Sequence, residues 1–224
     1  MSAVPVRHQM ALSEPTAGPA ATVLRRLMAA AAIALLAPLW LLTAAVVWTC
    51  LGRPLLFRQT RSGLNARPFT LWKFRTMHDW RNADGKPLPD AERQTPVTRF
   101  LRRLRLDELP QLVAIAKGEM AFIGPRPLLP GTIEGFGHPG LLRCTVLPGL
   151  TGWAQVNGNT QLTDVEKLAL DLWYVANRSF ALDCRILALT LLVVLRGERL
   201  QPENLAKAFA ATPALQLLAA GERS

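Results

Sequence analysis

Two consecutive carboxylates, Asp107 and Glu108, have residue types and a position that suit chemistry on phosphates. They stand immediately before Leu109-Pro110, inside a segment, 97–116, whose apolar spacing predicts helix. Proline suits a first helical turn, so Pro110 marks either a kink or the start of a second helix. At such a start the free N–H groups favour an ionised acid, and the same place suits a bound phosphate. The alternative is an ordinary solvated helix end.

Two basic side chains, Lys73 and Arg126, stand in segments that would hold them in place. Lys73 lies on a predicted strand, 68–75, which pairs as a β-hairpin with 57–65 and also carries Arg75 on the face of Lys73. Arg126 is bracketed by Pro125 and Pro127, which fix the backbone and present one guanidinium at low entropic cost. For Lys73 the alternative is a solvated hairpin edge.

The element that precedes these residues is an uncharged run, 27–52, with arginines on both sides. It is long enough to cross a bilayer, for which about 20 residues suffice. Basic flanks favour the cytoplasmic face, and here both flanks are basic. Pro38 removes a helical hydrogen bond near the centre of the run, so we expect a bend there. The prediction is a re-entrant helix in one leaflet, with a single-pass anchor as the alternative.

Charge and cysteine content restrict the class of protein. The chain has 224 residues and a net charge of +10, and residues 53–105 hold thirteen Lys/Arg against four Asp/Glu. A basic stretch after a membrane element fits anionic lipid or phosphate binding. Nucleic-acid binding is disfavoured, because no recognisable binding motif accompanies the charge. Three cysteines and three histidines, all scattered, suggest neither a disulfide framework nor a zinc site.

These patterns predict an α+β, predominantly helical protein of four parts. They are a disordered leader (1–20), the re-entrant membrane helix (21–53), a compact cytosolic domain (54–200) and an amphipathic or flexible tail (201–224). In the domain, a helix from Thr163 is expected to have an apolar stripe and an opposite polar stripe that includes Asp171 and Tyr174. The run 186–195 is too short to span a bilayer and predicts a buried or interfacial helix. A second helix, 204–211, is expected to lie on the bilayer surface.

Taken together and in order, five motifs resemble those of the bacterial sugar transferases known as monotopic phosphoglycosyl transferases. The motifs are Lys73-Phe74-Arg75-Thr76-Met77, Leu106-Asp107-Glu108-Leu109-Pro110-Gln111-Leu112, Lys117-Gly118-Glu119-Met120, Gly124-Pro125-Arg126-Pro127 and Pro148-Gly149-Leu150-Thr151-Gly152-Trp153-Ala154-Gln155-Val156-Asn157-Gly158. The resemblance extends from about Arg25 to Gly197.

The resemblance implies a monotopic enzyme of the bacterial inner membrane whose catalytic domain faces the cytoplasm. Its partners would be membrane lipids, a UDP-sugar and undecaprenyl phosphate, and it would transfer the sugar 1-phosphate to the lipid, releasing UMP, as a first membrane step of glycan assembly. By position, Asp107 would be the nucleophile that forms a phosphosugar-aspartyl intermediate. Glu108, with Asp107, would hold Mg²⁺.

The resemblance also assigns further roles. Arg102 and Arg126 match family arginines and are candidates for phosphate contacts, with Lys73 beside them. Asp171 and Gln155 are further active-site candidates, for which a purely structural role is an equal alternative.

The sequence departs from the family pattern in three places, one of which is Pro96-Val97-Thr98 in place of a common Arg-Phe-Gly upstream of the acidic pair. Ala37 replaces the serine common before the membrane proline, and Asn159 replaces the usual arginine after Val-Asn-Gly. The remaining alternative is a non-catalytic, membrane-tethered scaffold that binds anionic lipid through its basic segment. It accounts for the charge and the anchor but not for the motifs.

Overall fold

The computed structural model describes residues 18–215, so the predicted leader lies almost wholly outside the described part of the chain. Helix α1 (Pro19–Leu51) is the one helix in that range long and apolar enough, by length and composition, to cross a membrane. Most of its large apolar side chains are exposed: Leu35 is 80% and Leu41 73% accessible. Its outward surface therefore suits lipid rather than water.

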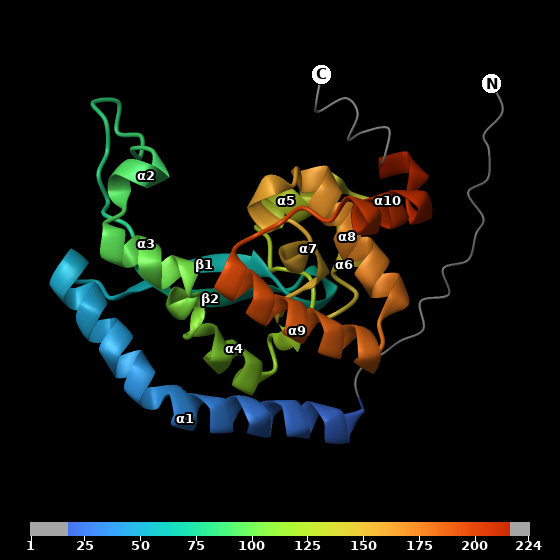
Figure 1. The fold of residues 1–224 in the computed structure, drawn as a ribbon, viewed down its shortest axis with the longest axis horizontal. Helices are drawn as coiled ribbons and strands as arrows, with labels where there is room; N and C mark the ends of the chain where they lie inside the picture. Colours follow the sequence, from blue (N-terminus) through green and yellow to red (C-terminus); the bar gives the residue numbers. More distant parts are fainter. Residues whose placement is uncertain (1–17, 216–224) are drawn as a thin grey trace.

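Helix α1 continues through Pro38 and is bent in its middle, as Figure 1 shows. Beyond the proline, the Thr43 hydroxyl donates a hydrogen bond of 2.7 Å to the Leu39 carbonyl, a back-bond that favours bending. The expected bend is present, in a continuous helix. On which side of a membrane its two ends lie stays a prediction.

The predicted hairpin is confirmed, with β1 (Leu56–Ser62) antiparallel to β2 (Pro68–Phe74) and η1 (Leu64–Ala66) in the turn between them. Phe69 and Leu71 are buried against α4 (Gln111–Lys117) and against α1. Since side chains alternate along a strand, Lys73 lies on the same face as these two apolar residues. It is therefore directed into the domain.

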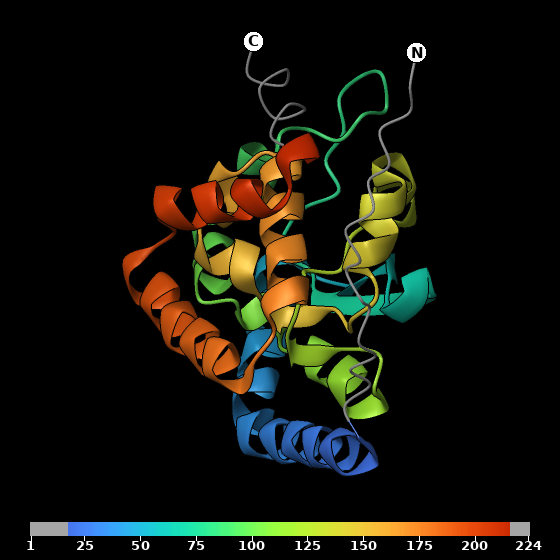
Figure 2. The same ribbon diagram turned by 90° about the vertical axis from the view of Figure 1, so that its right-hand side faces the viewer.

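The predicted helix 97–116 is divided into three pieces. Helix α3 (Pro96–Arg103), preceded by the short α2 (Asp90–Arg93), is followed by the 3₁₀ turn η2 (Leu106–Glu108) and then by α4. Arg105 has a positive φ of 56°, which interrupts the helix, and Pro110 is the N-cap of α4. Of the two alternatives for Pro110, a kink or the start of a second helix, the structure has the second. Figure 2 shows α4 between α1 and the rest of the domain.

A second sheet was not predicted. Strand β3 (Ala121–Ile123) pairs in parallel with β4 (Gly149–Thr151), a segment that the sequence analysis singled out only as part of a motif. Strands of three residues are too short to show alternation. Their pairing brings the Gly124-Pro125-Arg126-Pro127 segment beside the glycines of β4 and of the turn that follows.

The remaining helices build the core around α8. They are α5 (Pro130–Phe136), α6 (His138–Arg143), α7 (Trp153–Val156), η3 (Asn159–Gln161), α8 (Asp164–Asn177), α9 (Phe180–Arg196) and α10 (Pro202–Ala211). Helix α8 begins as predicted, after Thr163, which forms a capping box with Glu166.

Two expectations for this region need correction. Asp171 and Tyr174, expected on a polar outer stripe, are 2% and 1% exposed, because neighbouring helices pack against α8. Asp171 accepts a hydrogen bond from the buried Arg143 of α6, and the Tyr174 hydroxyl donates to the half-buried Asp183 of α9. Helix α9 has 17 residues rather than ten, since Ser179 caps it well before the apolar run.

Candidate active site

One large cavity, of about 810 Å³, brings together side chains from β2, α3, η2, the β3–α5 loop, α7, α8 and the segment after α9. All seven residues that the sequence singled out for the site line it. They are Lys73, Arg102, Asp107, Glu108, Arg126, Gln155 and Asp171. The cavity thus joins distant parts of the sequence, and its lining, which extends from Lys73 to Glu198, is rich in arginine.

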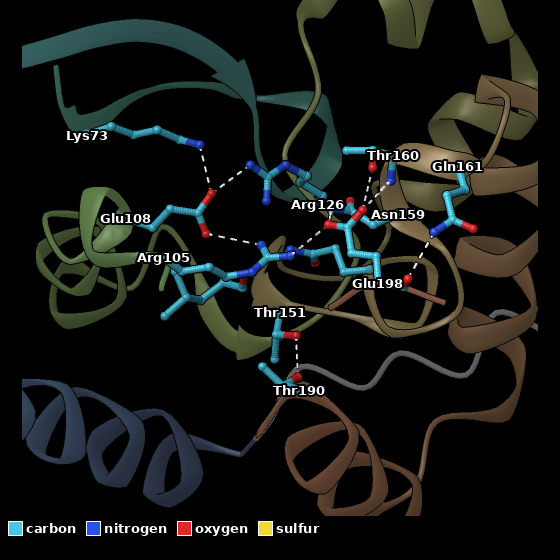
Figure 3. Close-up of polar contacts among 12 residues, drawn as sticks. Lys73, Arg105, Glu108, Arg126, Thr151, Asn159, Thr160, Gln161, Thr190 and Glu198 are labelled. Atoms are coloured by element: carbon cyan, nitrogen blue, oxygen red, sulfur yellow. Dashed lines mark hydrogen bonds and ion pairs between the residues drawn. The ribbon is translucent and has the colours of Figure 1, made fainter. Parts of the chain in front are cut away.

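Glu108 is the centre of an ion-pair cluster (Figure 3). Its Oε1 accepts hydrogen bonds from Lys73 Nζ at 2.8 Å and from Arg126 Nη2 at 2.7 Å. Its Oε2 is 3.5 Å from Arg105 Nη1. Burial alone would raise the pKa of Glu108, but the three cations outweigh burial and hold that pKa well below its usual range. Glu108 is therefore a permanent anion that fixes the cations around it.

Asp107 is in a different situation, although it is the preceding residue. It is 8% exposed and makes no hydrogen bond or ion pair within residues 18–215. Burial, and then the charge of Glu108, raise the pKa of Asp107 to about 6, against the opposing influence of Lys73 and Arg102. Its carboxylate is thus more basic than an ordinary aspartate, and no side chain in the described part of the chain pairs with it.

The two candidate arginines differ in how firmly they are held. Arg126 is paired with Glu108, and its side chain is 35% exposed toward the cavity. Arg102 is 39% exposed, and its nearest acidic partner is Asp90 at 3.9 Å. Arg102 is free to meet an anion that enters the cavity.

Two residues that the sequence did not single out connect the far rim of the cavity to this cluster. Arg105 lies between Glu108 and Glu198, with its Nη2 3.8 Å from the Glu198 carboxylate. Glu198 also accepts hydrogen bonds from Asn159 and from the backbone N–H and hydroxyl of Thr160. Arg105 is next to the Asp-Glu motif, but no local signal marked Glu198.

Gln155 and Asp171 line the cavity, but both are held by the protein itself. Gln155 donates to the Leu150 carbonyl at 3.1 Å, and Asp171 accepts from Arg143 Nε at 2.7 Å. Both residues are buried, at 3% and 2% exposure. This arrangement favours the structural reading of these two residues that the sequence left open.

The donor set limits the kind of metal site that this cavity could provide. No group of three or more His, Cys, Asp or Glu side chains able to hold a metal lies in the described part of the chain. Mg²⁺ is commonly bound by one or two carboxylates, with phosphate oxygens and water completing the shell. Asp107 offers a free carboxylate and Glu108 a carboxylate shared with cations. The pair fits a Mg²⁺ held mainly by substrate phosphates.

Comparison with known proteins identifies relatives of the whole region. Residues 19–197 match the family model described as bacterial sugar transferase. The chain is 47% identical over 164 residues to an uncharacterized sugar transferase, EpsL, of Bacillus subtilis, covering 73% of this chain and 81% of that protein.

Two further relatives have more informative names. Identity is 37% over 180 residues to a UDP-glucose:undecaprenyl-phosphate glucose-1-phosphate transferase of Caulobacter vibrioides, covering 75% of this chain and 67% of the relative. It is 36% over 179 residues to a UDP-N-acetylgalactosamine-undecaprenyl-phosphate N-acetylgalactosaminephosphotransferase of Aeromonas hydrophila. The match covers 76% of this chain but only 42% of that longer protein.

Proposed function

This chain belongs to the bacterial sugar transferase family and is a phosphoglycosyl transferase, and we propose that it transfers a sugar 1-phosphate from a UDP-sugar to undecaprenyl phosphate with release of UMP. The observation that carries the proposal is the contrast between two adjacent carboxylates in one cavity. Glu108 is neutralised by three cations, whereas the Asp107 carboxylate has no partner within residues 18–215 and has a raised pKa. An enzyme that forms a covalent adduct needs such an available nucleophile.

In the first step an Asp107 carboxylate oxygen attacks the β-phosphorus of the UDP-sugar. A new P–O bond forms to Asp107, the bond from this phosphorus to the oxygen bridging to the α-phosphate breaks, and UMP leaves with that oxygen. In the second step a phosphate oxygen of the lipid attacks the same phosphorus. The bond to Asp107 breaks, the carboxylate is regenerated, and the lipid diphosphate sugar is the product.

Cations make the first step feasible, because an anionic carboxylate must approach a diphosphate. Lys73 and Arg126 are fixed by Glu108 on the side of the cavity next to Asp107, and Arg102 remains open to the phosphates. Bound Mg²⁺, held by Asp107 and Glu108 together with substrate oxygens, would neutralise further diphosphate charge. Arginine suits phosphate because its planar fork meets two oxygens at once.

The proposal places the enzyme at the bacterial inner membrane with its domain facing the cytoplasm. Its support is the exposed apolar surface of α1 together with basic residues on both sides of the apolar run. An acceptor with a phosphate on an apolar chain would then lie in the same membrane as α1. The sugar is left open, since the relatives named above act on UDP-glucose in one case and UDP-N-acetylgalactosamine in another.

The test is to trap the intermediate. Full-length protein in detergent is incubated with Mg²⁺ and each of a panel of UDP-sugars, without lipid acceptor, and then digested for mass spectrometry. We expect one UDP-sugar to release UMP and to add the mass of a phosphosugar to the peptide containing Asp107. Addition of undecaprenyl phosphate should remove that mass.

The matched controls are Asp107→Asn, which removes the nucleophile, and Glu108→Gln, which keeps it but weakens the cation cluster. Asp107→Asn should give no adduct, and Glu108→Gln a slower one. Near-normal turnover by Asp107→Asn would end the assignment of the nucleophile. A folded wild-type protein that released no UMP from any UDP-sugar would favour the scaffold.

A further inference from the structure

The backbone around Arg126 is fixed by hydrogen bonds that other elements donate to its carbonyl groups. Pro125 and Pro127 have no N–H groups, so the backbone at these two positions cannot donate hydrogen bonds. Instead, four consecutive carbonyls each accept a hydrogen bond from another element. The bonds run from Gly149 N to Pro125 O at 2.9 Å, from Arg143 Nη2 to Arg126 O, from Arg61 Nη1 to Pro127 O at 3.3 Å and from Ser62 N to Leu128 O at 2.9 Å.

The donor to the Arg126 carbonyl differs from the others because it is a fully buried charge. Arg143, at the end of α6, is 3% exposed, and its Nε donates at 2.7 Å to Asp171 on α8, which is 2% exposed. The planar guanidinium thus joins the α8 carboxylate to the backbone of Arg126. A chain of contacts leads from Asp171 through Arg143 and Arg126 to Glu108.

Such a pair is a poor choice for stability alone. Taking two charges out of water costs several kcal/mol per ion, and well-packed apolar residues are often at least as stabilising. The second oxygen of Asp171 is buried without a hydrogen-bond partner in the described part of the chain, which adds to that cost. Unlike apolar residues, the pair provides a hydrogen-bond donor, the Arg143 guanidinium, that is directed at the Arg126 carbonyl.

We propose that Arg143 and Asp171 are positioning residues that fix the Arg126 backbone and thereby aim the Arg126 guanidinium at Glu108 and at the donor phosphates. This rests on the proposed function for the phosphate role of Arg126, but not for the positioning itself. Asp171 then acts through Arg143 and does not contact the substrate. The same chain explains why Asp171 lines the cavity while its carboxylate faces Arg143.

The first measurement needs no substrate. Phenylglyoxal modifies accessible arginines, and its rate at Arg126 can be followed by peptide mass spectrometry in the full-length protein. Arg143→Lys keeps the charge but cannot reach both partners with a planar fork, and Asp171→Asn keeps the shape but removes the charge. We expect Arg126 to react at least threefold faster in both variants than in wild type.

The matched control is Tyr174→Phe, on the same helix as Asp171. Tyr174 is 1% exposed and donates to Asp183 at 2.8 Å, but it does not line the cavity. Removing the Tyr174 hydroxyl deletes a polar contact of α8 but does not alter the segment that carries Arg126. The rate at which phenylglyoxal modifies Arg126 should therefore equal the wild-type rate. An equal increase in Tyr174→Phe would show general loosening of α8 and would overturn the proposal, as would unchanged Arg126 rates in both test variants.

A double-mutant cycle on UMP release supplies the second readout. Arg143→Lys should lower kcat/KM at least tenfold in the wild-type background but less than twofold in an Arg126→Lys background, because it acts through Arg126. Additive losses would instead indicate an independent contact with substrate and overturn the proposal. If no UDP-sugar is a substrate, the proposed function fails, and the Arg126 modification rates still decide the positioning role.

Discussion

Asp107 and Glu108 are neighbours in sequence with opposite electrostatic surroundings. Lys73, Arg105 and Arg126 stabilise the ionised form of Glu108. Burial and the negative charge of Glu108 disfavour the ionised form of Asp107. Their pKa values are therefore driven apart, which is the usual way in which two adjacent acids acquire different roles. The pattern suits Glu108 as the fixed organiser of cations and Asp107 as the reacting group.

This division predicts a cost in stability that depends on pH. The pKa of Asp107 is raised from its ordinary 3.8 to about 6, so the unfolded chain ionises first as pH rises. Stability is lost between about pH 4 and 6, by up to ~3 kcal/mol, and the loss stays constant above that range. Asparagine does not ionise, so the Asp107→Asn variant avoids this loss of stability. Its melting temperature should exceed that of wild type by several degrees at pH 7.5.

The measurement is thermal unfolding of detergent-solubilised full-length protein with a chelator present, because a bound divalent cation would lower the pKa of Asp107. The gain should be small at pH 4.5 and fully developed by pH 7. Asp79→Asn, which removes a carboxylate that is 74% exposed, is the control and should show no such trend. A gain of equal size at both pH values would contradict the raised pKa.

Among the elements, the short parallel pair β3–β4 sets the position of the Arg126 segment. Its two backbones are so close that a Cβ added at Gly149 would lie 2.1 Å from the Gly124 backbone nitrogen. A Cβ at Gly152 would be equally close to the Gly124 carbonyl oxygen. These glycines are required for space, because their neighbours are backbone atoms that cannot rotate away.

We therefore predict that Gly149→Ala lowers the free energy of unfolding by at least ~2 kcal/mol, an overpacking cost, and reduces transferase activity with it. Gly131 in α5 is the matched control, since a Cβ there meets nothing within 4 Å. Gly131→Ala should be neutral or slightly stabilising, because alanine is the better helix former. Denaturant unfolding of the two variants checks this, and similar stabilities would contradict the packing argument.

In the molecule as a whole, α1 provides the exposed apolar surface that suits contact with a membrane. It packs against α4 on one side and exposes large apolar side chains on the other, as Figures 1 and 2 show for its place along one side of the domain. The bend in its middle is compatible with both ends returning to one face of a bilayer. That topology is a prediction that labelling can test.

Single cysteines at Ala21 and at Arg67 flank the apolar run, and both native residues are exposed. Arg67 is preferable to Asn65, whose positive φ of 53° would strain a cysteine. In a background without Cys50, Cys144 and Cys184, a membrane-impermeant maleimide should label neither site in intact spheroplasts and both after permeabilisation.

Replacing Pro38 by leucine restores the missing helical hydrogen bond and should straighten α1. A fraction of molecules should then expose the Ala21 site to the periplasm, while the Arg67 site stays protected. Labelling of the Ala21 site from the periplasm in the protein with Pro38 intact would mean a single-pass anchor and would refute the re-entrant topology.

Features that depend on near neighbours in the chain were predictable from the sequence. Alternation predicted the hairpin that carries Lys73, the apolar stripe from Thr163 onward predicted α8, and the apolar run with Pro38 predicted a bent α1. The motifs pointed to the family and to the seven residues that line one cavity. Patterns of this kind arise because residues two, three or four apart share a face.

Which charges meet depends on the tertiary fold. Arg143 and Glu198 carry no local signal, and Asp171 was placed on an outer stripe because its buried partner comes from another helix. The three cations around Glu108 come from three segments, and the β3–β4 pair joins strands too short to show a pattern. Periodicity indicates which face of one element is apolar, but which polar side chains are buried and which charges pair depends on contacts between distant parts of the chain.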